Sequence, residues 1–113
     1  MNKMAFRIIL IMLTLLSGPV NAAGGLPANK INKLAFQTGG LFIYANNWAN
    51  PNSCSRNSAV VLLQSDPNYD KAYALILAAY MSGKMLSGYS DGCTEFDAQT
   101  YNTIRGHKYL TVE

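Results

Sequence analysis

The chain has 113 residues, half of them hydrophobic, and nine Lys and Arg residues face six Asp and Glu residues. The export signal predicted below contains Lys3 and Arg7, so the remainder carries seven basic against six acidic residues. So small a net charge excludes the strong field that attracts nucleic acid or an anionic membrane surface. We expect neither nucleic acid binding nor stable membrane insertion.

Residues 1–22 predict a secretory signal peptide. Lys3 and Arg7 begin it, residues 8–16 are an apolar run, and small residues lead to Ala22. This order is typical of a cleaved signal, with cleavage after Ala22 or, as the neighbouring choice, after Ala23. The apolar run is shorter than the roughly 20 residues that span a bilayer, although an N-terminal membrane anchor is the alternative. We expect a secreted or periplasmic protein.

Cys54 and Cys93 both follow the predicted signal. Export places them in an oxidising compartment, and two cysteines allow one intramolecular pairing. Closing a loop of about 40 residues stabilises a domain by roughly 4 kcal/mol in the chain-entropy model. We therefore predict a Cys54–Cys93 disulfide. A metal site or a catalytic thiol is the competing interpretation. Two Cys and one His fall short of four zinc ligands, and we expect no metal or cofactor.

The first half of the remaining chain predicts a leader, strands and a loop. Residues 23–29 combine Gly, Ala and Pro and predict a flexible leader before one domain, residues 30–113. Apolar runs with β-type composition then predict three strands, over residues 31–38, 41–44 and 58–64. Gly39-Gly40 predicts a hairpin turn between the first two. Residues 45–57 are rich in Asn, Ser and Pro and predict a loop.

A helix of about 16 residues is predicted next. Ser65 or Asp66 can cap it, Pro67 suits its first turn, and Gly83 suits its C-terminal end. Apolar residues recur at helical spacing, with Leu75 and Leu77 widening the stripe, so we expect a well-buried helix. The members of the stripe are Tyr69, Ala72, Tyr73, Ile76, Ala79 and Tyr80.

The last third predicts two more strands. They cover residues 84–89 and 101–112, and Gly106 is expected to mark a bulge in the second. A turn at residues 90–92 and a polar loop at residues 94–100 separate them. The element order is then β-β-β-α-β-β, mainly β with one helix. This order favours a small, partly open barrel of the oligonucleotide/oligosaccharide-binding (OB) type. An α+β layer, with the helix across a five-stranded antiparallel sheet, is the alternative.

The sequence offers little for catalysis. His107 is the single histidine, no Ser lies in a G-x-S-x-G turn, and Glu95 and Asp97 stand in a polar stretch that favours solvated surface. A glycine-rich phosphate loop is also missing from the sequence. We predict no catalytic residues and a protein that is not an enzyme.

A binding function has more support. Asn46, Asn47, Trp48 and Asn50 place a flat aromatic ring among amides, a mixture that suits a sugar, a protein interface or simple structural packing. Tyr89 and Asp91 form a second candidate ligand site near Cys93.

The helix adds candidates for an interface between subunits. Tyr69, Tyr73 and Tyr80 share its stripe, and Tyr suits half-wet surfaces better than dry cores. An ordinary core helix is the alternative.

The segment from Cys54 to Cys93 resembles small secreted bacterial proteins whose helix ends in an aromatic, a small residue and Gly-Lys before a strand. Here Tyr80-Met81-Ser82-Gly83-Lys84 occupies that place. It is similar, more distantly, to the binding subunits of AB5 toxins, in the subtilase-cytotoxin and pertussis-like branch. The resemblance implies an OB-type barrel, a homopentameric ring and recognition of host glycans. Any partner A subunit would be a separate chain. The chain matches no glycan-contact motif of that branch.

These observations predict a secreted, non-enzymatic binding protein of toxin B-subunit type. The alternatives are a monomeric periplasmic protein that binds or inhibits another protein, and a small hydrolase dependent on His107.

Overall fold

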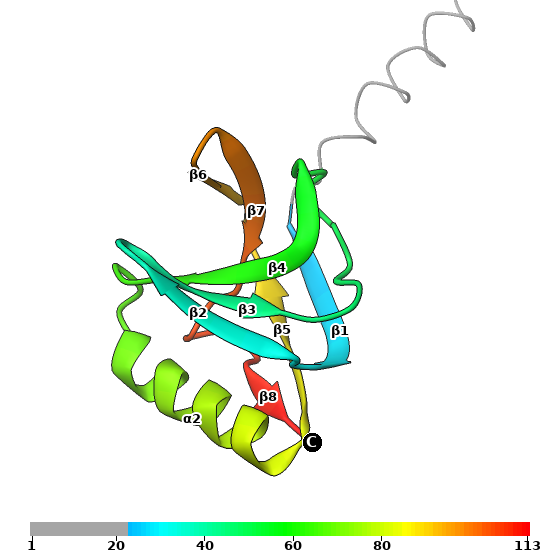
Figure 1. The fold of residues 1–113 in the computed structure, drawn as a ribbon, viewed down its shortest axis with the longest axis vertical. Coiled ribbons are helices and arrows are strands. Elements are labelled where there is room, and N and C mark those ends of the chain that lie inside the picture. The colour runs from blue at the N-terminus through cyan, green and yellow to red at the C-terminus, as the bar shows by residue number, and fades with distance from the viewer. Residues whose placement is uncertain (1–22) are drawn as a thin grey trace, which may run out of the picture.

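The computed structural model describes residues 23–113, so the predicted signal peptide lies outside the described residues. Within them the protein is mainly β with one helix, and its strands form two open sheets (Figure 1). The smaller sheet has the order β1-β5-β8 and the larger has the order β2-β3-β4-β7-β6. Their bounds are β1 Gly24–Lys30, β2 Lys33–Gln37, β3 Gly40–Tyr44, β4 Arg56–Leu63, β5 Met85–Ser90, β6 Cys93–Phe96, β7 Gln99–Thr103 and β8 Thr111–Val112.

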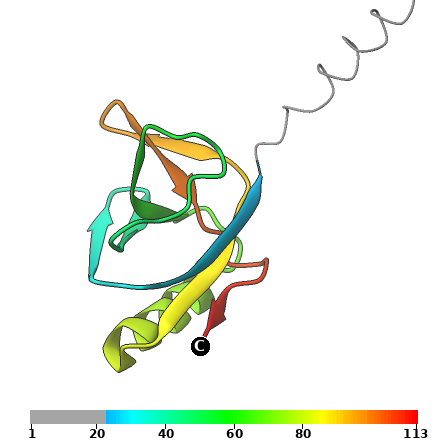
Figure 2. The same ribbon diagram turned by 90° about the vertical axis from the view of Figure 1, so that its right-hand side faces the viewer.

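The helix α2, Tyr69–Ser82, lies at the opposite end of the molecule from the β6–β7 hairpin (Figures 1 and 2). The prediction of this helix is confirmed. Gly83 ends it in a left-handed conformation with φ 71°, which a glycine adopts without the steric cost of a Cβ. The N-cap is Asn68, which makes no side-chain capping bond, rather than Ser65 or Asp66.

The core lies between the two sheets and the helix. The run Ala59-Val60-Val61-Leu62 lies in strand β4. It is continuously apolar because both faces of this strand are covered. Val60 and Leu62 face the main core with Ile76 of the helix, and Ala59 and Val61 face a second cluster around Phe42 on the other side of the sheet. The central strands of the larger sheet are therefore buried on both faces.

The flexible leader expected at residues 23–29 is instead strand β1, which pairs with β5. Leu26 carries the strand into the core at 1% exposure. Pro27, which has no N–H to donate, falls at the irregularity between Leu26 and Asn29, where the strand tolerates it. The segment has little intrinsic β propensity, so it forms a strand only because it pairs with β5, which is distant in sequence.

The polar loop expected at residues 94–100 is instead the β6–β7 hairpin. Its two central residues, Asp97 and Ala98, have φ 53° and 65°, the conformation that a two-residue hairpin turn needs. Glycine or asparagine usually signals such a turn, and neither stands there. The first hairpin turn is also displaced by one residue, since Gln37 pairs with Gly40 and Gly39 takes the positive φ.

The long final strand expected at residues 101–112 is broken. Strand β7 ends at Thr103, residues 104–110 are irregular, and only β8 follows. Gly106 marks no bulge but a close approach to the helix, because a Cβ there would lie 2.9 Å from the Cβ of Ala72. Strand β7 runs parallel to β4, so the alternative of one antiparallel sheet is also wrong.

Candidate functional site

Trp48 is buried in the core, at 1% exposure. Its indole Nε1 donates a hydrogen bond to the carbonyl oxygen of Ile43, at 2.9 Å. Both the ring and its polar tip are therefore used inside the domain. Of the three interpretations of Trp48, this burial fits structural packing, because the ring offers no open face to a sugar.

Asn46 and Asn47 are exposed, and both accept hydrogen bonds from other asparagines. Asn32 Nδ2 donates to Asn46 Oδ1 at 3.1 Å, and Asn57 Nδ2 donates to Asn47 Oδ1 at 2.9 Å. These bonds tie the loop to the strands beside it. The two amides therefore serve the loop, as turn-forming side chains commonly do.

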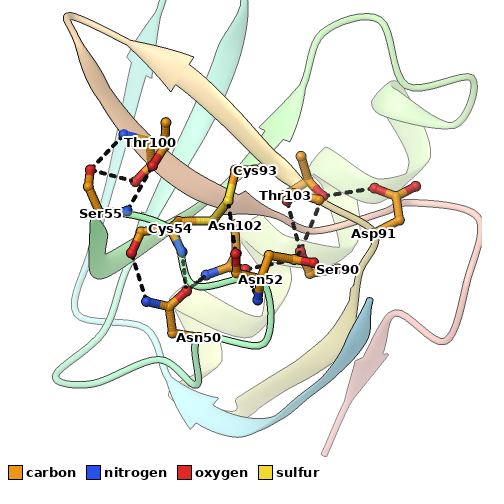
Figure 3. Close-up of a disulfide and its surroundings, with 11 residues drawn as sticks. Asn50, Asn52, Cys54, Ser55, Ser90, Asp91, Cys93, Thr100, Asn102 and Thr103 are labelled. Carbon is orange, nitrogen blue, oxygen red and sulfur yellow. Dashed lines mark hydrogen bonds between the residues drawn. A yellow bond between two sulfur atoms is a disulfide. The ribbon is translucent and has the colours of Figure 1, made fainter. Parts of the chain in front are cut away.

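Asn50 belongs to a polar network beside the disulfide (Figure 3). Its Oδ1 accepts from the backbone N–H of Cys54 at 2.8 Å and from Asn102 Nδ2 at 2.7 Å. Asn52 Nδ2 in turn donates to Asn102 Oδ1 and to Ser90 Oγ, each at 2.8 Å. Asn102 and Ser90 are fully buried, so these bonds satisfy polar groups that water cannot reach. The network holds the loop in place rather than presenting it to a ligand.

The predicted disulfide is confirmed: Cys54 and Cys93 are bonded, with Cα atoms 5.8 Å apart. It joins the loop before β4 to the first residue of β6, across the same network (Figure 3). Cys54 is buried and Cys93 is exposed. The covalent bond and the asparagines thus fix one structural unit.

Tyr89 and Asp91 lie beside residues that follow β7. Lys108 Nζ stands 4.1 Å from the centre of the Tyr89 ring, a cation–π contact. Thr103 Oγ1 donates to Asp91 Oδ1 at 3.0 Å, and Arg105 Nη1 lies 3.6 Å from Asp91 Oδ2. Thr103 also bonds Ser90, so Asp91 belongs to the same hydrogen-bond network as Asn50 (Figure 3). The structure therefore links one residue from each predicted ligand set, whereas Asn46 and Asn47 bond Asn32 and Asn57 outside this network.

Asp66 is a buried carboxylate that sequence reasoning treated only as a cap. Oδ1 accepts from the N–H of Asn68, and Oδ2 accepts from the N–H of Gly106, both at 2.9 Å. Arg105 Nε lies 3.2 Å from Oδ2, an ionic contact without the alignment of a hydrogen bond. His107 Nδ1 is 4.0 Å away. Asp66 therefore fastens residues 105–107 to the start of the helix.

The three helix tyrosines differ in exposure. Tyr69 and Tyr73 are partly buried and stacked, with ring centres 6.3 Å apart, and Tyr73 meets Phe36 of β2 at 5.5 Å. Tyr80 is exposed. Burial raises the pKa of Tyr69 above its ordinary value, and the neighbouring Tyr73 and Asp70 raise it further.

Large apolar side chains cover one flank of the helix and remain exposed. We call them the helix patch: Phe36, Leu77, Tyr80 and Met81. Phe36 is 64% exposed and Met81 is 76% exposed. No charged residue occurs from Ala72 to Ser82, so the helix is apolar all round, as in a helix that is covered on every side. This uncharged run is visible in the sequence, where it predicted a well-buried helix with Leu77 in the core of its own domain.

An aromatic cluster covers the outer face of the larger sheet. Phe42 is buried there because Tyr44, Phe96 and Tyr101 surround it, at ring-centre distances of 5.0 to 6.3 Å. These three rings are only partly buried. We call them, with Phe42, the aromatic face. Sequence reasoning missed it because its members come from three strands distant in sequence, and Phe96 lies in the segment that was expected to be a loop.

Polar groups border the aromatic face. Lys33 Nζ lies 4.2 Å from the centre of the Tyr44 ring, and Gln37 Nε2 donates to Asp97 Oδ2 at 3.1 Å. Lys33, Gln37 and Asp97 are exposed. Partly open rings therefore stand beside an ammonium, an amide and a carboxylate.

Two general searches of residues 23–113 gave negative results. No group of three or more His, Cys, Asp and Glu side chains there is placed to hold a metal ion. None of the helices in that range has the length and apolar character needed to cross a membrane.

Comparison of the chain with protein-family models, curated proteins and solved structures found no match.

Proposed function

We propose that this chain is a secreted, non-enzymatic binding protein of toxin B-subunit type, which assembles into a ring through helix α2 and recognises glycans. The observation that carries the proposal is the helix patch. A chain exported alone would leave Phe36, Leu77, Tyr80 and Met81 in water, at a cost of about 25 cal/mol for each Å² of apolar surface. A second copy would remove that surface from water.

The strand pairing supports an OB-type barrel. Strands β1 and β2 follow each other with two residues between them, and so do β5 and β6. If each pair is counted as one bent strand, the pairings form a cycle: β1 with β5, β6 with β7, β7 with β4, β4 with β3, and β3 with β2. On this count the core is surrounded by five strands, two of them bent, with a helix at one end, as in the OB fold.

The aromatic face supports recognition of sugars. In OB folds the middle strands and the nearby loops form a common site for oligosaccharides and oligonucleotides. A partly open Tyr101 ring can cover the C–H face of a pyranose, and Tyr44 can do so once the Lys33 ammonium above it moves to a sugar hydroxyl. Gln37 and Asp97 bond each other but are exposed, so they can exchange that bond for a sugar hydroxyl. The near-neutral charge disfavours oligonucleotides. The glycan site is therefore proposed on this face rather than at Trp48.

Export is the remaining part of the proposal. The Cys54–Cys93 disulfide is consistent with an oxidising compartment, where such bonds form and persist. Whether that compartment is the periplasm or the medium is left to fractionation of cells that express the full chain.

The assembly is tested by sedimentation velocity of oxidised residues 23–113. The wild type should sediment as an oligomer, and Leu77→Gln/Met81→Gln should sediment as a monomer with an unchanged circular dichroism spectrum. Ala78→Gln is the matched control, because Ala78 is exposed and adds no large apolar side chain to the patch. A monomeric wild type would reject the ring and favour the alternative in which the patch covers a different protein.

The glycan part is tested on a glycan array with surface plasmon resonance on the hits. Tyr44→Val should weaken the binding of a hit by about 3- to 10-fold, the range for a lost aromatic contact. Asn46→Ala, in the loop first expected to hold the ligand, is the control and should bind like the wild type. No hit with the assembled wild type, or a loss at Asn46 but not at Tyr44, would contradict this assignment.

A further inference from the structure

The two flanks of helix α2 have different shapes. On one flank, Tyr73, Leu77 and Met81 follow Asp70 at spacings of three, seven and eleven residues, so they form one row beside Phe36. On the other flank, Leu75 borders a groove of about 370 Å³ between the helix and residues 106–110. One flank therefore protrudes with exposed apolar side chains, and the other is hollow.

The groove is built by fixed contacts. The Asp66 carboxylate holds the N–H of Gly106 at 2.9 Å, and Asn68 Nδ2 donates to the carbonyl oxygen of Gly106 at 3.3 Å. The lack of a side chain at Gly106 lets this segment lie against Ala72. Tyr109 and Leu110, further along the same segment, also line the groove.

Tyr109 is the unusual member of that lining. Its φ is 56°, a left-handed conformation that a bulky residue rarely adopts, and its side chain is 78% exposed. A strained backbone that places a large aromatic ring in water is unexpected for a residue that only packs within its own domain. The groove and the helix patch are thus both apolar surfaces without a cover among residues 23–113.

The charges of the two flanks are complementary. Asp70 stands in the row of the patch, whereas Lys71 precedes Leu75 by four residues and lines the groove. Lys108 and His107 line the same groove. The patch thus carries an acid at its end, and the groove carries basic groups at its rim.

We infer that the helix patch of one copy inserts into the groove of the next copy, with Asp70 facing Lys71 and Lys108. This inference rests on the proposed assembly and specifies its interface. Because the two surfaces differ and lie on opposite flanks of one helix, the contact is head-to-tail, and its repetition gives a closed ring or a filament. A self-complementary dimer would instead need one surface to meet itself.

Mixing two variants tests the inference by native mass spectrometry. Leu77→Gln/Met81→Gln removes the patch, and Leu75→Gln/Tyr109→Gly removes the groove wall, where glycine also accepts the positive φ. Each variant alone should be monomeric. Their equimolar mixture should give a heterodimer, because one intact patch and one intact groove make a single contact that cannot be extended.

Two results would overturn the head-to-tail contact while leaving the ring itself in place. The first is a groove variant that assembles like the wild type. The second is a mixture that stays monomeric although the wild type assembles. A monomeric wild type would instead remove the proposed assembly and the inference together.

A charge exchange gives a second test that leaves the apolar surfaces intact. Asp70→Lys and Lys71→Asp should each weaken assembly by about 2- to 5-fold, the range for a partly exposed ion pair. The double exchange, Asp70→Lys/Lys71→Asp, should restore assembly, because both flanks change sign and the first helical turn keeps one acid. Single variants that assemble like the wild type, or a double variant weaker than either, would contradict the predicted pairing of flanks.

Discussion

The loop at residues 45–55 and helix α2 use their side chains in opposite ways. The loop is rich in amides, yet Asn47 bonds Asn57, Asn50 bonds Asn102, and Trp48 lies in the core. The helix carries no charge after Lys71, yet Leu77 and Met81 remain exposed. The difference shows that a side chain's type does not identify a binding surface. What matters is whether its bonding capacity or apolar area is already used within the domain.

The largest expected loss of stability follows removal of the disulfide that anchors the loop at residues 45–55. Cys54→Ala/Cys93→Ala should lower the free energy of unfolding by about 4 kcal/mol, because the unfolded chain regains the entropy of a loop of about 40 residues. Urea unfolding followed by circular dichroism measures this loss. An unchanged midpoint would show that the asparagine network alone fixes the loop.

Trp48→Phe should destabilise the domain by roughly 2–3 kcal/mol. The change removes part of a core ring and leaves the Ile43 carbonyl without the donor that now lies 2.9 Å away. Urea unfolding again gives the value, with glycan binding measured on the same sample. Unchanged stability together with lost glycan binding would mean that the loop, and not the aromatic face, meets the ligand.

Asn102→Ala should cost about 1–3 kcal/mol, because the buried network then lacks its central acceptor and donor. Asn46→Ala, at an exposed amide, should change stability by less than about 0.5 kcal/mol. Thermal unfolding of the two variants side by side makes the comparison. Equal effects would show that the buried and exposed asparagines of the loop do not differ in role.

The smallest effect on folding is expected at the helix patch. Met81→Gln should change the free energy of unfolding of the dissociated chain by less than about 0.5 kcal/mol, since Met81 is mostly exposed. The measurement uses chemical unfolding at a concentration at which the chain is monomeric. A loss of more than about 1 kcal/mol would place Met81 in the core of its own domain.

The elements that sequence reasoning placed well are those whose signals are local. The helix carries its periodicity and its terminal Gly83, and β3 and β4 carry dense apolar runs. With only two cysteines after the predicted signal, Cys54 and Cys93 could form only one intramolecular disulfide, and they do. Each of these follows from neighbouring residues or from counting.

The elements that were missed depend on partners distant in sequence. Strand β1 contains two glycines and a proline and becomes a strand by pairing with β5. The Asp97-Ala98 turn lacks the usual glycine, and the break after Thr103 arises because Asp66 draws Gly106 to the helix. The aromatic face needs the β6–β7 hairpin to pair beside β4 and β3, so no local pattern could reveal it.

Native mass spectrometry of oxidised wild-type residues 23–113 tests the central claim most directly. We predict an oligomer in which each chain has lost two hydrogens to the disulfide. A chain that remains monomeric at micromolar concentration, with its disulfide intact, would contradict the claim that the helix patch is covered by another copy.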